Sequence, residues 1–264
     1  MFILKRYLKF YESNGLIKTI LKIILTPIRV INKKIYNTKK VKIFEQNSAK
    51  KKFELIYKTN FWSSKESVSG LGSEYKNTIN IRKELTNLIK EYNIESILDA
   101  PCGDFNWIQS ILNKNLKYIG GDIVKKLIDK NNNIYKDENI NFISLDITTD
   151  KLPQVDLMIC RDCLYHFSYE DIFKFFENFI NSNIRLLLTT SHYFSDKFFF
   201  KNKNILTGDY REIDLFSEPF NFKKNYLLSI EDKVESHFLE NKFLYLFSRK
   251  QISEFVKIKT SGHK

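Results

Sequence analysis

The chain has 264 residues, a formal net charge of +12 at neutral pH, and 43% hydrophobic and 15% aromatic side chains. This apolar content can form a sizeable core, which excludes a wholly disordered chain, and no apolar run reaches the roughly 20 residues of a membrane-spanning helix. Three cysteines are too few for a disulfide framework, and no signal-peptide-like apolar segment follows the first lysines. We therefore expect a reduced, cytoplasmic protein.

The positive charge is concentrated at the N-terminus. Residues 1–52 contain 14 Lys or Arg and two acids, Glu12 and Glu45, whereas residues 53–264 contain equal numbers of bases and acids. We therefore expect two parts, a basic N-terminal helix with its linker at 1–52 and a neutral domain at 53–264.

Residues 2–36 show apolar side chains at helical spacing with lysines between them, and Pro27 is expected to end or kink this helix. A basic amphipathic helix can lie on an anionic membrane surface, pack on its own domain or a partner, or contact nucleic acid. Residues 37–52 are interpreted as a polar, lysine-rich linker.

Beyond the linker, short apolar runs alternate with amphipathic helical segments. The runs predict strands at 95–99, 117–122, 140–146, 155–161 and 184–190, and a closing hairpin at 226–230 and 243–247. Continuous apolar strands separated by helices indicate an α/β fold, with a parallel sheet covered on both faces.

The most informative local pattern is SILDAPCGDFNW, residues 96–107, in which an apolar strand enters a tight turn with one glycine. Such a turn exposes backbone N–H groups to a ligand. The turn does not fit the G-x-G-x-x-G pattern of dinucleotide sites, which needs glycines near Pro101 and Asn106, and Asp104 would repel a pyrophosphate. An acid at the strand end instead suits a positively charged ligand.

Acids follow three consecutive predicted strands: Asp99, Asp122 and Asp146. A carboxylate after the second strand can accept hydrogen bonds from two ribose hydroxyls. Each acid alone could be a helix N-cap, but the carboxyl ends of parallel strands meet at one edge of a sheet. The three acids together therefore predict a ligand site at this edge.

With these motifs the sequence resembles the class I S-adenosylmethionine-dependent methyltransferases. It is similar to a bacterial subgroup with an LDxPCGDFxW turn (98–107), an SGxGS segment (69–73) and an RDCLxH strand end (161–166). The resemblance implies a Rossmann-like, seven-stranded, mostly parallel sheet with a reversed last strand and helices on both faces. It also implies a role in capsule or other surface-polysaccharide biosynthesis. Pro101 and Phe105 replace glycines of many superfamily members.

The resemblance further implies the residues that hold S-adenosylmethionine. Asp99 would bind the cofactor's ammonium group, Asp122 its ribose hydroxyls and Asp146 its adenine amino group. The full set is Asp99, Pro101, Gly103, Asp104, Asp122, Ile123, Asp146, Ile147 and Arg161.

Methylation of a hydroxyl usually calls for a general base, for which histidine is suited. His166 is the first candidate, with Asp162 orienting it or acting itself, and His192 is the second. His166 could equally cap a helix that begins near Ser168.

Arg211, with Asp209 and Tyr210, follows the fifth strand, where acceptor pockets are expected from the resemblance. Arg211 could clamp a phosphate or carboxylate, or could pair with Glu212 or Asp214.

We therefore expect an S-adenosylmethionine-dependent methyltransferase that O-methylates a sugar, nucleotide-sugar or phosphate-linked metabolite. Residues 1–36 could contact the inner face of the membrane peripherally, or could pack on the protein's own domain or on a partner. The competing functions are a nucleic-acid or other N-methyltransferase, against which the neutral domain argues, and a catalytically silent membrane-associated scaffold. No metal is expected, because Cys160, Cys163 and His166 have too few partner ligands for zinc.

Overall fold

The computed structural model describes residues 2–194, 200–233 and 241–261. Its chain forms two compact units, Met1–Gln46 and Asn47–Lys264. The division falls a few residues before the domain boundary that the charge distribution predicted.

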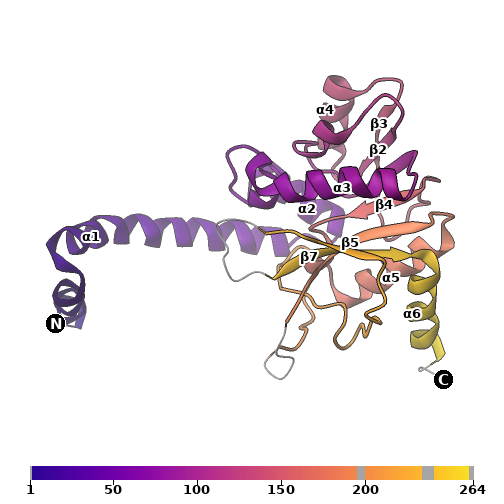
Figure 1. Cartoon of the computed structure of the whole chain (residues 1–264). Helices are drawn as coiled ribbons and strands as arrows, with labels where there is room; N and C mark the ends of the chain where they lie inside the picture. Colours follow the sequence, from indigo (N-terminus) through magenta and orange to yellow (C-terminus); the bar gives the residue numbers. More distant parts are fainter. Residues whose placement is uncertain (1, 195–199, 234–240, 262–264) are drawn as a thin grey trace. The chain divides into compact units, whose positions relative to one another are not determined.

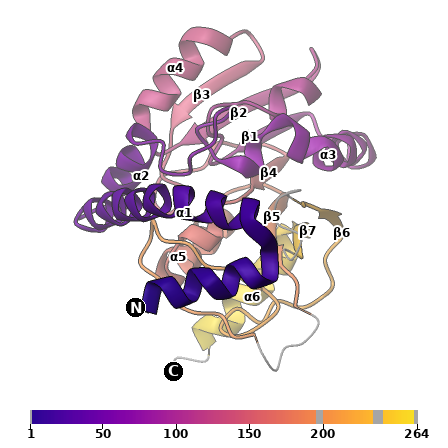
Figure 2. The same cartoon turned by 90° about the vertical axis from the view of Figure 1, so that its left-hand side faces the viewer.

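The first unit consists mainly of helix α1 (Phe2–Phe44), which changes direction at the non-helical residue Gly15 (Figure 2). Pro27 was predicted to end or kink the helix. It lies inside α1, so the helix does not end there, and the predicted linker is largely helical. One reason is that residues 28–44 contain neither glycine nor a second proline that would break the helix. Within the described residues, no helix combines the length and apolar character needed to cross a membrane.

The second unit combines a seven-stranded sheet with five α-helices among its described residues (Figure 1). The helices are α2 (Ala49–Lys58), α3 (Ile79–Glu91), α4 (Lys125–Tyr135), α5 (Tyr169–Asn181) and α6 (Arg249–Ser261). The strands are β1 (Ser96–Asp99), β2 (Lys117–Asp122), β3 (Ile140–Ser144), β4 (Leu157–Cys160), β5 (Leu186–His192), β6 (Leu228–Glu231) and β7 (Lys242–Ser248).

The strand order is β3-β2-β1-β4-β5-β7-β6, and the labels in Figure 2 follow it across the sheet. Strands β1 to β5 pair in parallel, whereas β7 runs antiparallel to both β5 and β6. The predicted mostly parallel sheet with a reversed last strand is therefore confirmed.

Helices cover both faces of the sheet, and successive side chains of a strand point to opposite faces. Ile97 packs in a cluster with α3 and α4, and its neighbour Leu98 packs in a second cluster with α5 and α6. Figure 1 shows α3 and α5 on opposite sides of the sheet. This packing holds the central strands in place and leaves their carboxyl ends to carry the polar residues.

Candidate functional site

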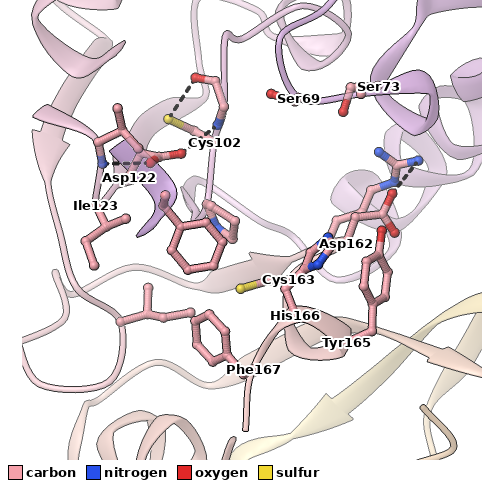
Figure 3. A pocket seen from close by; sticks show the side chains of 18 of the residues that line it. Ser69, Ser73, Cys102, Asp122, Ile123, Asp162, Cys163, Tyr165, His166 and Phe167 are labelled. Carbon is pink, nitrogen blue, oxygen red and sulfur yellow. Dashed lines mark hydrogen bonds and ion pairs between the residues drawn. The ribbon is translucent and has the colours of Figure 1, made fainter. Parts of the chain in front are cut away.

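A cavity of about 530 Å³ lies at the carboxyl ends of β1, β2, β4 and β5. Figure 3 shows Asp122 and Ile123 on one side of it and Asp162, Tyr165 and His166 on the other. Helix α2 and the SGxGS segment at 69–73 supply further walls. Ligands of open α/β sheets bind at this edge, so the cavity is the candidate site.

The turn after β1 is tied to β2 and to the SGxGS segment. Gly103 has φ 55° and donates its N–H to Asp122 Oδ2 at 3.2 Å. A Cβ at Gly103 would overlap Ser69 Oγ, so this position needs glycine both for its backbone conformation and for the close approach.

Two buried carboxylates line the cavity from the last residues of β1 and β2. Asp99 accepts a hydrogen bond from the Tyr118 hydroxyl at 2.8 Å, and Asp122 also accepts from Val124 N at 2.9 Å. Burial raises the pKa of Asp99 to about 7 and that of Asp122 to about 6. A cationic ligand would favour the ionised form of both groups, so this pair fits a ligand that carries an ammonium group.

Most residues implied to hold the cofactor line the cavity: Asp99, Pro101, Gly103, Asp122, Ile123, Asp146, Ile147 and Arg161. Asp104 is absent from this lining. Its carboxylate instead accepts from the Ser67 hydroxyl at 2.8 Å and from Val68 N at 2.9 Å. The structure therefore gives Asp104 a different role from the predicted one, that of fixing the loop before the SGxGS segment.

A buried network of four charged side chains forms part of the cavity wall, to which Arg161, Asp162 and Lys242 contribute. Arg161 makes a two-pronged ion pair with Asp232, and its guanidinium also donates to Gly72 O. Lys242 donates to both carboxylate oxygens of Asp162, at 2.9 and 3.0 Å, and lies 3.4 Å from Asp232. Burial alone would raise the pKa of Asp162, but Arg161 and Lys242 hold it well below its usual range. Asp162 is therefore suited to fix cations rather than to accept a proton.

His166 is held in one tautomer. Its Nδ1 lies 2.7 Å from the carbonyl oxygen of Asp209, which can only accept, so Nδ1 carries the proton and Nε2 holds the free lone pair. The imidazole stacks on Trp62, with ring centroids 5.4 Å apart and an interplanar angle of 30°. Burial lowers the pKa of His166 to about 4, so the ring is neutral at pH 7 and Nε2 keeps its lone pair.

His192 is engaged differently. Its Nδ1 lies 3.1 Å from Ile213 N and 3.3 Å from the carbonyl oxygen of the same residue, so the backbone of Ile213 serves this nitrogen in either tautomer. Burial lowers the pKa of His192 to about 4 as well, and the charge of Lys242 acts in the same direction. His192 also lines the cavity, but the contact of His166 with Asp209 O defines which ring nitrogen holds the lone pair, so His166 is the better candidate for a base.

Arg211 is not available to clamp a substrate. Its guanidinium donates to the carbonyl oxygens of Leu164, Phe167 and Lys203, and it does not line the cavity. Burial lowers the pKa of Arg211 to about 10, so it remains charged at neutral pH. Asp209 contributes its backbone carbonyl to His166, and Tyr210 alone of the predicted acceptor residues lines the cavity.

Several cavity residues were missed by sequence reasoning. Lys242 and its buried neighbour Asp232 come from the C-terminal hairpin, far from any motif. Phe53 and Tyr57 line the cavity from α2, and Trp62 follows α2. The Phe61-Trp62 pair was visible as an aromatic dipeptide, but nothing in the sequence placed it beside His166.

Among the described residues, no group of His, Cys, Asp and Glu is arranged to hold a metal ion. Cys102, Cys160 and Cys163 are buried and unoxidised.

Comparison with known proteins locates the fold. No protein-family model and no curated protein matches the sequence. The chain is similar to the structure of PigF with SAH, at 11% identity over 81% of this chain and 68% of PigF, with a TM-score of 0.52. Human N-acetylserotonin methyltransferase in complex with SAM matches over 65% of this chain and 52% of its own, at 13% identity and a TM-score of 0.47. Magnesium protoporphyrin IX methyltransferase from Synechocystis PCC 6803 with SAH matches over 66% and 84%, at 11% identity and a TM-score of 0.48. Together with the strand order above, the similarity to PigF shows a Rossmann-like, seven-stranded methyltransferase fold.

Proposed function

We propose that this protein is an S-adenosylmethionine-dependent O-methyltransferase acting on a small molecule. The main support for this proposal is the pair of buried carboxylates, Asp99 and Asp122, at the strand ends of a methyltransferase fold. Their pKa values are raised by burial, which fits a cationic cofactor. The structures of similar fold that contain SAM or SAH support the same cofactor.

The residues divide between holding the cofactor and handling the acceptor. Asp99 and Gly103 would hold its methionine end, Asp122 the ribose, and Asp146 with Ile147 the adenine. When bound, S-adenosylmethionine supplies a methyl group on a sulfonium that becomes a neutral thioether. His166 Nε2 would take the proton of the acceptor hydroxyl as the new O–C bond forms, and the cavity walls would align the two reactants.

The capsule or surface-polysaccharide role implied by the sequence resemblance is part of this proposal as its biological context. The phosphate-clamping role of Arg211 is not, because its guanidinium is occupied by backbone carbonyls.

Calorimetric titration with S-adenosylmethionine and S-adenosylhomocysteine tests the proposal. We expect micromolar binding of both by the wild type and loss of binding in Asp122→Ala. Asp129→Ala is the matched control, because Asp129 pairs with Lys125 on the exposed surface of α4. Absence of binding by folded wild-type protein would contradict an enzymatic role and favour a methyltransferase-like scaffold.

A further inference from the structure

The part of the cavity around His166 is built from aromatic rings. Besides the stacked Trp62, the Tyr165 and Tyr210 rings lie 4.6 and 5.9 Å from the His166 ring, between centroids. Phe53, from α2, lies against Phe167 at 6.2 Å. Flat apolar faces therefore surround the candidate base, and such faces bind the apolar faces of rings.

The described cations that line the cavity are neutralised by the protein itself. Arg161 pairs with Asp232, Lys242 pairs with Asp162, and Lys174 Nζ lies 2.6 Å from Glu170. An anionic group of an acceptor would have to compete with these carboxylates for each cation.

Carboxylates also outnumber cations in the described lining. The described lining contains five carboxylates and three cations, so its formal charge is −2 when all are ionised. The carboxylates are Asp99, Asp122, Asp146, Asp162 and Asp171, and the cations are Arg161, Lys174 and Lys242. Bound S-adenosylmethionine, with a net charge of +1, would still leave the cavity negative. Because like charges repel strongly in a partly buried site, phosphate and carboxylate groups are disfavoured there.

We infer that the acceptor is an uncharged sugar ring that lies against Trp62 and presents a hydroxyl to His166 Nε2. Asp171, which accepts a hydrogen bond from the Thr207 hydroxyl, and Tyr210 also line the cavity and can exchange hydrogen bonds with further sugar hydroxyls. This combination of aromatic faces and polar edges suits a sugar better than a plain aryl ring. The inference rests on the proposed function and narrows its substrate class.

Saturation-transfer NMR on full-length protein, after calorimetry has shown that it is saturated with S-adenosylhomocysteine, tests this inference. The probes are the methyl glycosides of glucose, galactose, mannose, rhamnose and N-acetylglucosamine, then glucose 6-phosphate, then phenol. At least one neutral glycoside should bind, and glucose 6-phosphate should bind at least ten-fold more weakly, which corresponds to about 1.4 kcal/mol. Trp62→Ala should weaken glycoside binding about ten-fold, whereas Trp62→Phe keeps a stacking ring and should retain it.

Tyr75→Ala is the control, because Tyr75 is an exposed aromatic residue outside the cavity lining. Failure of S-adenosylhomocysteine to bind would overturn the proposed function itself. If it binds, equal or tighter binding of glucose 6-phosphate, binding of phenol alone, or no signal from any glycoside would overturn only the inference about the acceptor. Unchanged glycoside binding in Trp62→Ala would remove the stacking role.

Discussion

Asp99 and Asp122 couple cofactor binding to pH. Burial raises their pKa values to about 7 and 6, so part of the population of each carboxyl is protonated near pH 6. A protonated Asp99 cannot attract the ammonium group, and a protonated Asp122 is a weaker acceptor for the ribose hydroxyls. We expect S-adenosylmethionine affinity to increase as pH rises from 6 to 8, with net proton release on binding near pH 6.5. Calorimetry in buffers of different ionisation enthalpy measures this release. Asp99→Asn should bind more weakly and release fewer protons, and proton uptake by the wild type would contradict the assignment.

His166 should be needed for turnover and not for cofactor binding. Removing a general base typically lowers the rate by about 10²- to 10⁴-fold, so His166→Gln should lose kcat to this extent with an unchanged Kd for S-adenosylhomocysteine. Because burial lowers its pKa to about 4, its protonation should reduce activity only as pH falls towards 4. The comparison variant is His192→Gln, with a smaller expected loss of kcat. A larger loss of kcat in His192→Gln than in His166→Gln would indicate that His192 is the general base.

At the scale of elements, the four-charge network joins β4, the segment after β6, and the start of β7. Asp232 is fully buried, so Asp232→Asn would leave Arg161 and Lys242 with Asp162 as the remaining carboxylate of the network. Breaking a buried ion pair costs about 3–5 kcal/mol, and we expect urea denaturation to show a loss of this order. Glu231→Gln is the adjacent control, because the Glu231–Lys233 pair is about half exposed and should contribute less than about 1 kcal/mol. Equal effects of the two changes would contradict the network's role.

The elements whose pattern is local were predictable, and those set by distant contacts were not. The first five strands were predicted because each is a short apolar run that alternates with helical segments, and the last two were predicted as a hairpin. Asp99, Asp122 and Asp146 follow from their positions at strand ends. Of the two predicted effects of Pro27, ending the helix did not occur, because residues 28–44 contain neither glycine nor a second proline.

The acceptor side was harder to predict than the cofactor side. Arg211 has the residue type of a phosphate clamp, but three carbonyls of the surrounding loops use its donors. Lys242 and Asp162 are 80 residues apart in the sequence, and they meet because β7 pairs antiparallel with β5. No local pattern encodes such a contact.

At the scale of the whole molecule, charge and apolar exposure both concentrate in the first unit. Half of the exposed large apolar side chains recorded for the described residues belong to α1, including Leu16, Val30, Ile31, Ile35 and Val41. Lysines alternate with them along the helix. Exposed apolar side chains beside cations suit the surface of an anionic bilayer, where each lysine near the headgroups contributes about 1 kcal/mol.

We therefore predict that the full-length protein floats with vesicles of phosphatidylglycerol and phosphatidylethanolamine and is released by high salt, because salt screens the lysine contacts. A double variant, Ile31→Asp with Ile35→Asp, should lose most of this binding. The two residues lie on the same face of α1, and the change removes apolar area and adds negative charge there. Ile134→Asp is the matched control, because Ile134 is a comparably exposed isoleucine on α4. Equal flotation of all three proteins would assign α1 to a protein partner or to internal packing. Retention of S-adenosylhomocysteine binding by the double variant would show that its loss of flotation does not come from misfolding.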